Sequence, residues 1–264
     1  MGAGACLAQS PTTSPQPTPA TPPSVSVAPV TPRPVPAFYR NLVVLDPAHG
    51  GPDSGARLPD NTLEKDVTLA FAQRLRPALA AQGFTVATTR DSDTAAGLTT
   101  DQRAGTANHI RPLACILIHA TATGSGVHIA SSSLTPDDTP ATRALPWETA
   151  QATSVIMSLR LANEIGLSVV ASKMPVTLLR ASVPPVDNLV CPAVVIELAP
   201  ITSAAVTDAA YQQQIAGAIA TALASFRTHN APAPSVVPPA AKPPSNPSVP
   251  APTATPVPKP GVPQ

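Results

Sequence analysis

The chain has 264 residues, and its 36 prolines gather at the two ends, ten between Pro11 and Pro36 and thirteen between Pro232 and Pro263. Removing the three charged residues of these ends leaves 13 of the 16 Lys and Arg residues against 15 Asp and Glu residues, a formal charge of −2. This balance and an aromatic content of only 3% argue against a nucleic-acid partner, and no apolar run approaches the roughly 18–20 residues of a membrane-spanning helix.

The first eight residues resemble the end of a signal peptide. Cys6-Leu7-Ala8 places small residues three and one positions before Gln9, as a cleavage site requires. The charged and apolar parts of such a signal would lie upstream of Met1. Our hypothesis is that the protein is exported to the periplasm or cell envelope, and an unstructured cytosolic N-terminus is the alternative.

The two proline-rich ends predict disordered segments on either side of one folded domain. They carry almost no large apolar residues, so they cannot bury enough surface to offset the entropy of the chain. We therefore predict a linker over residues 9–37, a catalytic domain over residues 38–229 and a tail over residues 230–264. The central segment is a normal size for one domain with a full core.

The first predicted element of the domain is a buried strand over residues 42–45. This apolar run ends in a polar, glycine-rich loop that carries His49. A helix is expected from near Asn61 to Gln82, and Pro77 should kink it or split off its last turn. Its buried stripe recurs at every fourth residue: Val67, Phe71, Leu75 and Leu79.

Strands and helices continue to alternate along the rest of the domain. Strands are predicted over residues 84–89, 115–118, 126–130, 176–179 and 193–196, and helical segments over residues 99–108, 148–165 and 209–226. This order predicts an α/β fold with three layers, in which a mostly parallel, twisted sheet has helices on both faces. Zinc exopeptidases can share this kind of sheet.

Four side chains of the predicted domain are candidates for zinc catalysis. His49, His119 and Glu197 come at or just past strand ends, and open α/β sheets form their sites beyond the carboxyl ends of strands. Catalytic zinc takes three protein ligands and leaves one position for water, so the imidazoles of His49 and His119 and the carboxylate of Glu64 are candidate ligands. Glu197 is a candidate general base that takes a proton from the water.

Two of the candidates also have an ordinary structural interpretation. Asn61 and Glu64 have the spacing of a capping box, in which Glu64 would close the N-terminus of its helix. His119, after an apolar strand, fits a hydrogen-bonded boundary histidine. Glu197 is harder to explain in this way, because burying a carboxylate beside a sheet costs several kcal/mol unless a partner is present. His109 and His128 are expected to have surface or structural roles.

Three cysteines form no disulfide framework. Cys115 and Cys191 each lie in an apolar run, which favours buried, unreactive thiols. A disulfide between these two residues is the alternative in an oxidising compartment.

The motifs that carry the candidate residues resemble those of a known family. Four signatures of the zinc-dependent N-acetylmuramoyl-L-alanine amidases of the AmiC/CwlV type are matched in order, by residues 45–56 (LDPAHGGPDSGA), 64–67 (EKDV), 118–120 (IHA) and 192–198 (PAVVIEL). The resemblance covers about residues 42–226. It departs from the family pattern at Leu117, Thr121 and residues 198–201, and these positions are expected to line the cleft.

The resemblance implies hydrolysis of the amide bond between N-acetylmuramic acid and L-alanine in peptidoglycan by a zinc-activated water. His49, Glu64 and His119 would bind one Zn²⁺, and Glu197 would be the general base. Peptidoglycan is then the expected partner, and the chain is expected to work as a monomer. Two alternatives are a catalytically impaired module that binds peptidoglycan and a zinc exopeptidase that acts on cell-wall peptides.

Overall fold

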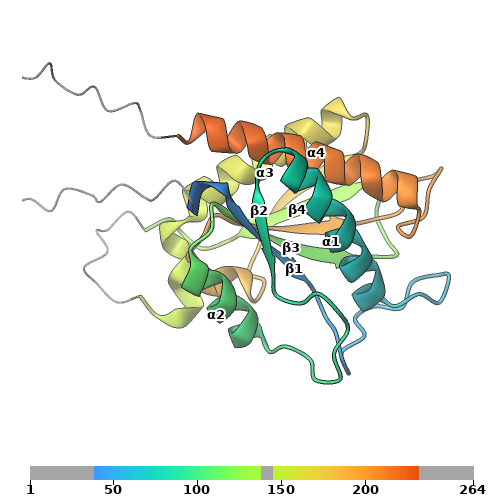
Figure 1. Ribbon diagram of the computed structural model, residues 1–264, viewed down its shortest axis with the longest axis horizontal. Coiled ribbons are helices and arrows are strands. Elements are labelled where there is room, and N and C mark those ends of the chain that lie inside the picture. The colour runs from blue at the N-terminus through green and yellow to red at the C-terminus, as the bar shows by residue number, and fades with distance from the viewer. Residues whose placement is uncertain (1–38, 138–144, 232–264) are drawn as a thin grey trace, which may run out of the picture. The chain divides into compact units, whose positions relative to one another are not determined.

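A computed structural model describes residues 39–137 and 145–231 of the chain. The signal-peptide end, the linker before residue 38 and the tail from residue 232 onwards lie outside the described residues, so these predictions stay untested. The described segments form a six-stranded sheet with helices packed against it (Figure 1).

The sheet has the strand order β2-β1-β3-β6-β4-β5. Its strands are β1 (Leu42–Pro47), β2 (Thr85–Thr88), β3 (Ala114–Ala120), β4 (Val127–Ser132), β5 (Val176–Ala181) and β6 (Ala193–Leu198). Four neighbouring pairs are parallel, and β4 pairs with β6 in the antiparallel direction. The prediction of an α/β fold with a mostly parallel sheet is confirmed.

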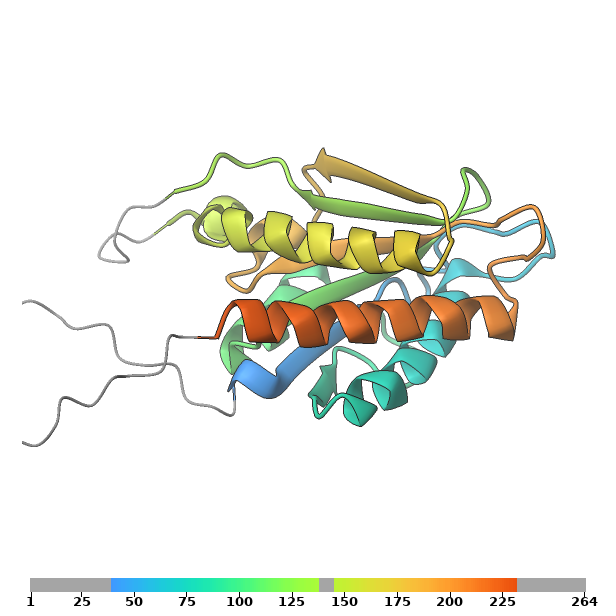
Figure 2. The ribbon, with the colours of Figure 1, turned by 90° about the horizontal axis from the view of Figure 1, so that it is seen from above.

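Helices cover the two faces of the sheet unequally. On one face, α4 (Ala209–His229) packs against both α1 (Glu64–Ala81) and α3 (Val155–Ala171), and Figure 2 shows α3 and α4 side by side. Their apolar side chains form the larger core with one set of strand residues. On the other face, α2 (Thr100–Ile110) presents the small side chains Ala104 and Ala107 to a second core, which includes Leu117 and Val195.

Strand burial explains the apolar runs that were visible in the sequence. β1 is buried at every position, and β3 and β6 are buried except at His119 and Glu197. Because these central strands are covered on both faces, their sequences do not alternate between polar and apolar residues. The two half-buried positions therefore mark where the cover on the α2 face ends.

The start and middle of α1 differ from the prediction. The helix begins at Glu64 after Leu63, which makes no side-chain cap, and Asn61 has a left-handed backbone with φ 65°. The capping-box interpretation is therefore wrong, and the Glu64 carboxylate is free for other contacts. The helix also runs unbroken past Pro77 to Ala81. Pro77 faces solvent, whereas Leu75 and Leu79 on either side are fully buried and hold the last turn to the core.

The predicted helix over residues 148–165 is divided in two. A 3-10 helix spans Trp147–Thr153, and α3 begins after Ser154, whose hydroxyl donates to the Val190 carbonyl at 2.8 Å. This contact links the break to the segment before β6, and the two pieces are bent by 66°. Among the described residues, this bent pair passes a length and apolarity test for a membrane span, and no single helix does.

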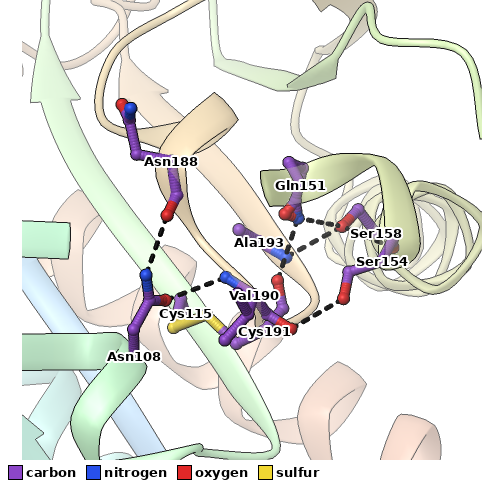
Figure 3. The surroundings of a disulfide bond; sticks show 9 residues. All are labelled: Asn108, Cys115, Gln151, Ser154, Ser158, Asn188, Val190, Cys191 and Ala193. Carbon is purple, nitrogen blue, oxygen red and sulfur yellow. Dashed lines mark hydrogen bonds between the residues drawn. A yellow bond between two sulfur atoms is a disulfide. The ribbon is translucent and has the colours of Figure 1, made fainter. Parts of the chain in front are cut away.

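Cys115 and Cys191 form a disulfide, with Cα atoms 6.2 Å apart (Figure 3), so the prediction of free thiols is wrong. The pairing of β3 with β6 places Cys115 opposite Ala193, and the chain just before β6 brings Cys191 beside it. Asn108 of α2 holds the same segment. Its side-chain oxygen accepts from the Val190 amide at 2.8 Å, and its nitrogen donates to the Asn188 carbonyl at 2.8 Å.

Candidate active site

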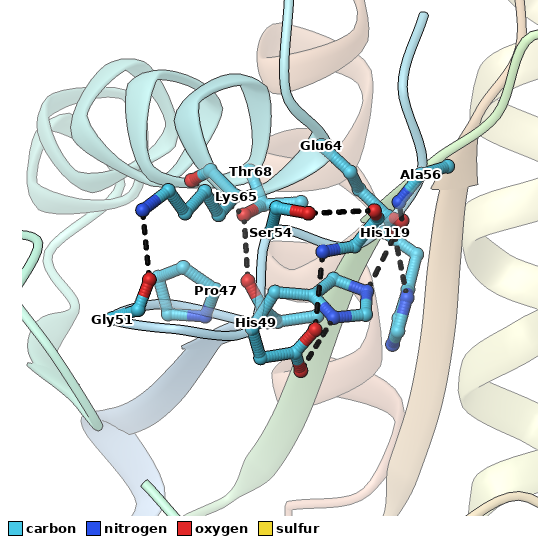
Figure 4. Close-up of polar contacts among 12 residues, drawn as sticks. Pro47, His49, Gly51, Ser54, Ala56, Glu64, Lys65, Thr68 and His119 are labelled. Carbon is cyan, nitrogen blue, oxygen red and sulfur yellow. Dashed lines mark hydrogen bonds and ion pairs between the residues drawn. The ribbon is translucent and has the colours of Figure 1, made fainter. Parts of the chain in front are cut away.

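Three of the predicted site residues converge at the carboxyl ends of β1 and β3. One possible ligand atom from each of His49, Glu64 and His119 lies within 4.8 Å of the others. Nε2 of His49 is 3.1 Å from one Glu64 oxygen, and Nδ1 of His119 is 2.9 Å from the other (Figure 4). Two imidazoles and one carboxylate that lie this close together match the donor set of catalytic zinc.

The Glu64 carboxylate is buried at the first residue of α1 and satisfied by several donors. It accepts hydrogen bonds from the Ala56 amide at 2.8 Å and the Ala120 amide at 3.2 Å. Burial by itself raises the pKa of Glu64, but the hydrogen bonds from His119, His49 and these two amides outweigh it and hold the pKa well below its usual value. The carboxylate is therefore ionised at neutral pH, as a metal ligand must be.

His49 is oriented by its neighbours on both the ring and the backbone. Nδ1 lies 2.9 Å from an Asp53 carboxylate oxygen, which favours the tautomer that leaves Nε2 free to bind a metal. The hydrogen bond to Glu64 raises the pKa of His49 against the lowering effect of burial, and Asp53 adds to the rise. The His49 backbone is left-handed, with φ 64°, and its carbonyl accepts from Nη2 of Arg103 at 2.6 Å.

Two buried arginines hold the loop that leads to His49. Arg103 donates to the Asp46 carboxylate at 2.6 Å and to the Pro47 carbonyl at 2.9 Å. Arg90 donates to the Pro47 carbonyl at 2.9 Å and to the Ala48 carbonyl at 3.0 Å. The turn after β1 is thus fixed by side chains from α2 and from the loop after β2.

Gly55 shows how tightly the site is built. Its backbone is left-handed, with φ +64°, and a Cβ atom there would lie 2.6 Å from Cδ2 of His49 and 2.7 Å from a Glu64 oxygen. Only glycine fits both the conformation and the space. This requirement accounts for the last glycine of the HGGPDSG run.

Glu197 lies next to His119, on the neighbouring strand. The two residues are register partners in β6 and β3, and strands in a sheet are about 4.8 Å apart. Both side chains are half-buried on the α2 face, two residues beyond the buried Val195 and Leu117. The structure thus brings the fourth predicted residue to the edge of the His49, Glu64 and His119 cluster.

His128 is a neighbour of Glu197 that the sequence analysis did not identify. Its side chain is 19% exposed, and its Nδ1 lies 2.7 Å from the Glu197 carboxylate. Alternation along the predicted strand indicates that His128 lies on the opposite face of the sheet from the apolar Val127 and Ile129. It does not indicate that β4 pairs with β6. His109 is exposed, as predicted.

The departures from the family pattern lie in different environments. Leu117 is 1% exposed and belongs to the core on the α2 face, so the expectation that it lines the cleft is wrong. Leu198 and Ala199 are also fully buried. Thr121 and Pro200 line a small apolar pocket of about 100 Å³ at the carboxyl edge of the sheet.

Comparison with known proteins identifies the family. The family model for N-acetylmuramoyl-L-alanine amidases (Amidase_3) matches residues 43–225, which is more than half of the chain. The chain therefore belongs to this family, and the resemblance seen in its motifs is confirmed.

Curated relatives match over a short segment. The chain is 55% identical over 53 residues to the germination-specific N-acetylmuramoyl-L-alanine amidase of Bacillus subtilis, a segment that covers 20% of this chain and 22% of that protein. It is 43% identical over 54 residues to the N-acetylmuramoyl-L-alanine amidase AmiC of Neisseria meningitidis, which covers 20% of this chain and 13% of that protein. The matches thus span less than a quarter of these relatives.

Solved structures show the same fold over a longer range. The amidase Ami1 of Mycobacterium smegmatis has a TM-score of 0.60 at 24% identity, over 73% of this chain and 99% of that chain. The catalytic domain of CwlV from Bacillus (Paenibacillus) polymyxa has a TM-score of 0.53 at 22% identity, over 70% of this chain and 97% of that chain. At these identities the likeness establishes the fold.

Proposed function

We propose that the chain hydrolyses the amide bond between N-acetylmuramic acid and L-alanine in peptidoglycan with one zinc ion. The observation that carries this proposal is the meeting of His49, Glu64 and His119 within 4.8 Å of one another. Membership of the amidase family supports an activity on peptidoglycan.

The proposed roles follow from the contacts of each residue. A bound zinc ion supplies a Lewis acid and lowers the pKa of a water molecule. Glu64 offers an ionised carboxylate, and Asp53 keeps Nε2 of His49 available. Glu197 accepts one proton from the attacking water and delivers it to the amide nitrogen. The water oxygen bonds to the lactyl carbonyl carbon, the C–N bond breaks, and the L-alanine amino group is released.

The proposed substrate requires a location outside the cytoplasm, in the periplasm or cell envelope. The Cys115–Cys191 disulfide supports this location, because such bonds persist in oxidising compartments. Within this proposal, residues 38–229 are the catalytic domain, and the proline-rich segments on either side are linkers.

Digestion of purified sacculi tests the proposed reaction. We expect the full chain to release stem peptides with a free L-alanine amino end, to stop doing so with a chelator, and to recover with added zinc. Release of single terminal amino acids would instead identify a zinc exopeptidase. Binding to sacculi with no released product, with or without zinc, would identify a binding module.

Two substitutions separate the proposed ligand from the proposed base. His49→Ala should lose both zinc and activity, because it removes one of three ligands. Glu197→Ala should keep zinc but lose roughly 10²–10⁴-fold in turnover, the range of a general base. Zinc content by atomic emission and peptide release from sacculi measure the two effects. An unchanged rate for Glu197→Ala contradicts the mechanism.

A further inference from the structure

His128 stands in a row of three polar side chains that crosses the sheet. The register pairs His119 of β3 with Glu197 of β6, and pairs the same Glu197 with His128 of β4. Glu197 therefore lies between a proposed zinc ligand on one strand and a second imidazole on the other. The antiparallel direction of β4 produces this alignment.

The contact between His128 and Glu197 is a short one in a half-buried place. Nδ1 of His128 lies 2.7 Å from Oε2 of Glu197, and the two side chains are 19% and 38% exposed. Hydrogen bonds to an ionised carboxylate at this distance are among the stronger ones in proteins. This contact engages Oε2 and does not involve Oε1.

The loop after β3 lies against the Cε1–Nε2 edge of the His128 ring. A Cβ atom on Gly124 would lie 2.3 Å from Cε1 and 2.5 Å from Nε2 of His128, so the loop backbone rests against the imidazole. Gly124 also has a left-handed backbone, with φ +85°, which glycine adopts without strain. The imidazole is thus confined between the Glu197 carboxylate and the loop that follows His119.

We propose that His128 is a positioning residue, which holds Oε2 of Glu197 so that Oε1 faces the attacking water. The inference rests on the proposed amidase function and on Glu197 as its base. A carboxylate on a flexible side chain loses rate when it rotates away from the reacting proton. A ring held by the loop at Cε1 and Nε2 and bonded to Glu197 through Nδ1 opposes this rotation. The imidazole itself contacts neither the substrate nor the zinc ligands in this proposal.

Steady-state kinetics on a soluble disaccharide-peptide fragment of peptidoglycan test the proposal. His128→Leu should lower kcat by roughly 10–100-fold, the usual effect of losing a hydrogen-bond partner that orients a site residue. KM and the zinc-to-protein ratio should stay unchanged. His128→Asn places an amide donor near the position of Nδ1 and should keep most of the activity. A general disturbance of the strand would lower both variants alike.

The chain offers a matched control in His229, whose Nδ1 lies 2.7 Å from Glu164 in another histidine–glutamate pair, between α4 and α3. His229→Leu should leave kcat unchanged. Melting temperatures of all variants report on folding. If His128→Leu does not fold, the comparison of His128→Asn with a His128→Gln variant, whose longer side chain shifts the donor, still measures the effect on kcat.

A double-mutant cycle shows whether His128 acts through Glu197. In a Glu197→Gln background, His128→Leu should cause no further loss, because the group that it orients is already inactive. An additional loss of the same size there would overturn the proposal, as would an unchanged kcat for His128→Leu alone or a second zinc ion that depends on His128. If the wild-type chain releases no L-alanine amino ends, both the proposed function and this inference are overturned. If the wild type is active and His128→Leu has the same kcat, only the inference is overturned.

Discussion

At the scale of single residues, Asp53 connects the proposed ligand set to the loop around it. One carboxylate oxygen lies 2.9 Å from Nδ1 of His49, and the other accepts the Gly55 amide at 3.1 Å. Gly55 is the position where an added side chain would strike both His49 and Glu64. The exposed Asp53 carboxylate therefore orients the His49 ring and also holds the turn at Gly55, which packs against both His49 and Glu64.

Removal of the Asp53 carboxylate should weaken zinc binding without unfolding the protein. Asp53→Ala leaves the His49 ring free to rotate, and we expect a loss in zinc affinity of roughly 10–100-fold. Competition with a zinc-binding dye measures it. Asp60→Ala is the control, because Asp60 is also exposed and accepts the Thr62 amide at 3.1 Å. Equal affinities for the two variants would show that Asp53 does not orient the ligand.

At the scale of elements, the buried pair of Arg103 and Asp46 joins α2 to the end of β1. Their side chains are each 8% exposed and lie 2.6 Å apart. Arg103→Met leaves the Asp46 charge buried without its partner, so the free energy of unfolding should fall by about 3–5 kcal/mol. Urea denaturation measures the change, and zinc affinity should fall as well, because Arg103 also holds the His49 carbonyl.

A second ion pair serves as the control for this substitution. Arg76 contacts Asp91 with both side chains largely exposed, and exposed pairs contribute about 0–1 kcal/mol. Arg76→Met should therefore change the free energy of unfolding by less than about 1 kcal/mol. Similar losses for the two variants would mean that burial does not decide the contribution of these pairs.

The Cys115–Cys191 disulfide joins β3 to the segment before β6, the two strands that carry His119 and Glu197. It closes a loop across a sequence separation of 76 residues. Reduction, or the double substitution of both cysteines by alanine, should lower the free energy of unfolding by about 2–4 kcal/mol. Denaturation with and without a reductant measures it. A reductant should have no effect on the alanine variant, and an effect there would point to another cause.

At the scale of the whole molecule, the ligand residues make stability depend on pH when zinc is absent. The pKa of His49 is raised above 6.5, so its contribution is complete below pH 6.5 and is lost as the pH rises through the raised value. The pKa of Glu64 is lowered from 4.5, so its contribution is present above pH 4.5 and is lost as the pH falls through the lowered value. Both contributions are present together between pH 4.5 and 6.5.

Bound zinc should counteract the loss of stability that the zinc-free protein shows as the pH rises. Protons compete with the metal for imidazole nitrogens, so zinc binds more tightly as the pH rises. We expect the difference in melting temperature between zinc-loaded and chelator-treated protein to widen from about pH 6 to about pH 8. At a zinc concentration of about 1,000 times Kd, the stabilisation is about 4 kcal/mol. A difference that stays constant or narrows would contradict metal binding by His49.

The sequence by itself determined the class of the fold and most of the candidate site. Apolar runs such as residues 42–45 and 193–196 formed central strands because local composition already required burial on both faces. The order of strands and helices then forced a mostly parallel sheet. His49, His119 and Glu197 could be grouped in advance, because strands of such a sheet bring their carboxyl ends to one edge. Glu64 joined them as the carboxylate that a zinc site needs and as part of the second family motif.

The tertiary structure decided what depends on neighbours that are remote in the chain. Glu64 fits a capping box by spacing alone. Only the tertiary structure shows that its carboxylate contacts His49 and His119 instead of capping the helix. Cys115 and Cys191 look like separate core thiols until β3 pairs with β6. His128 reaches Glu197 because β4 pairs with β6 in the antiparallel direction, and no local pattern in the sequence records which strand will be its neighbour.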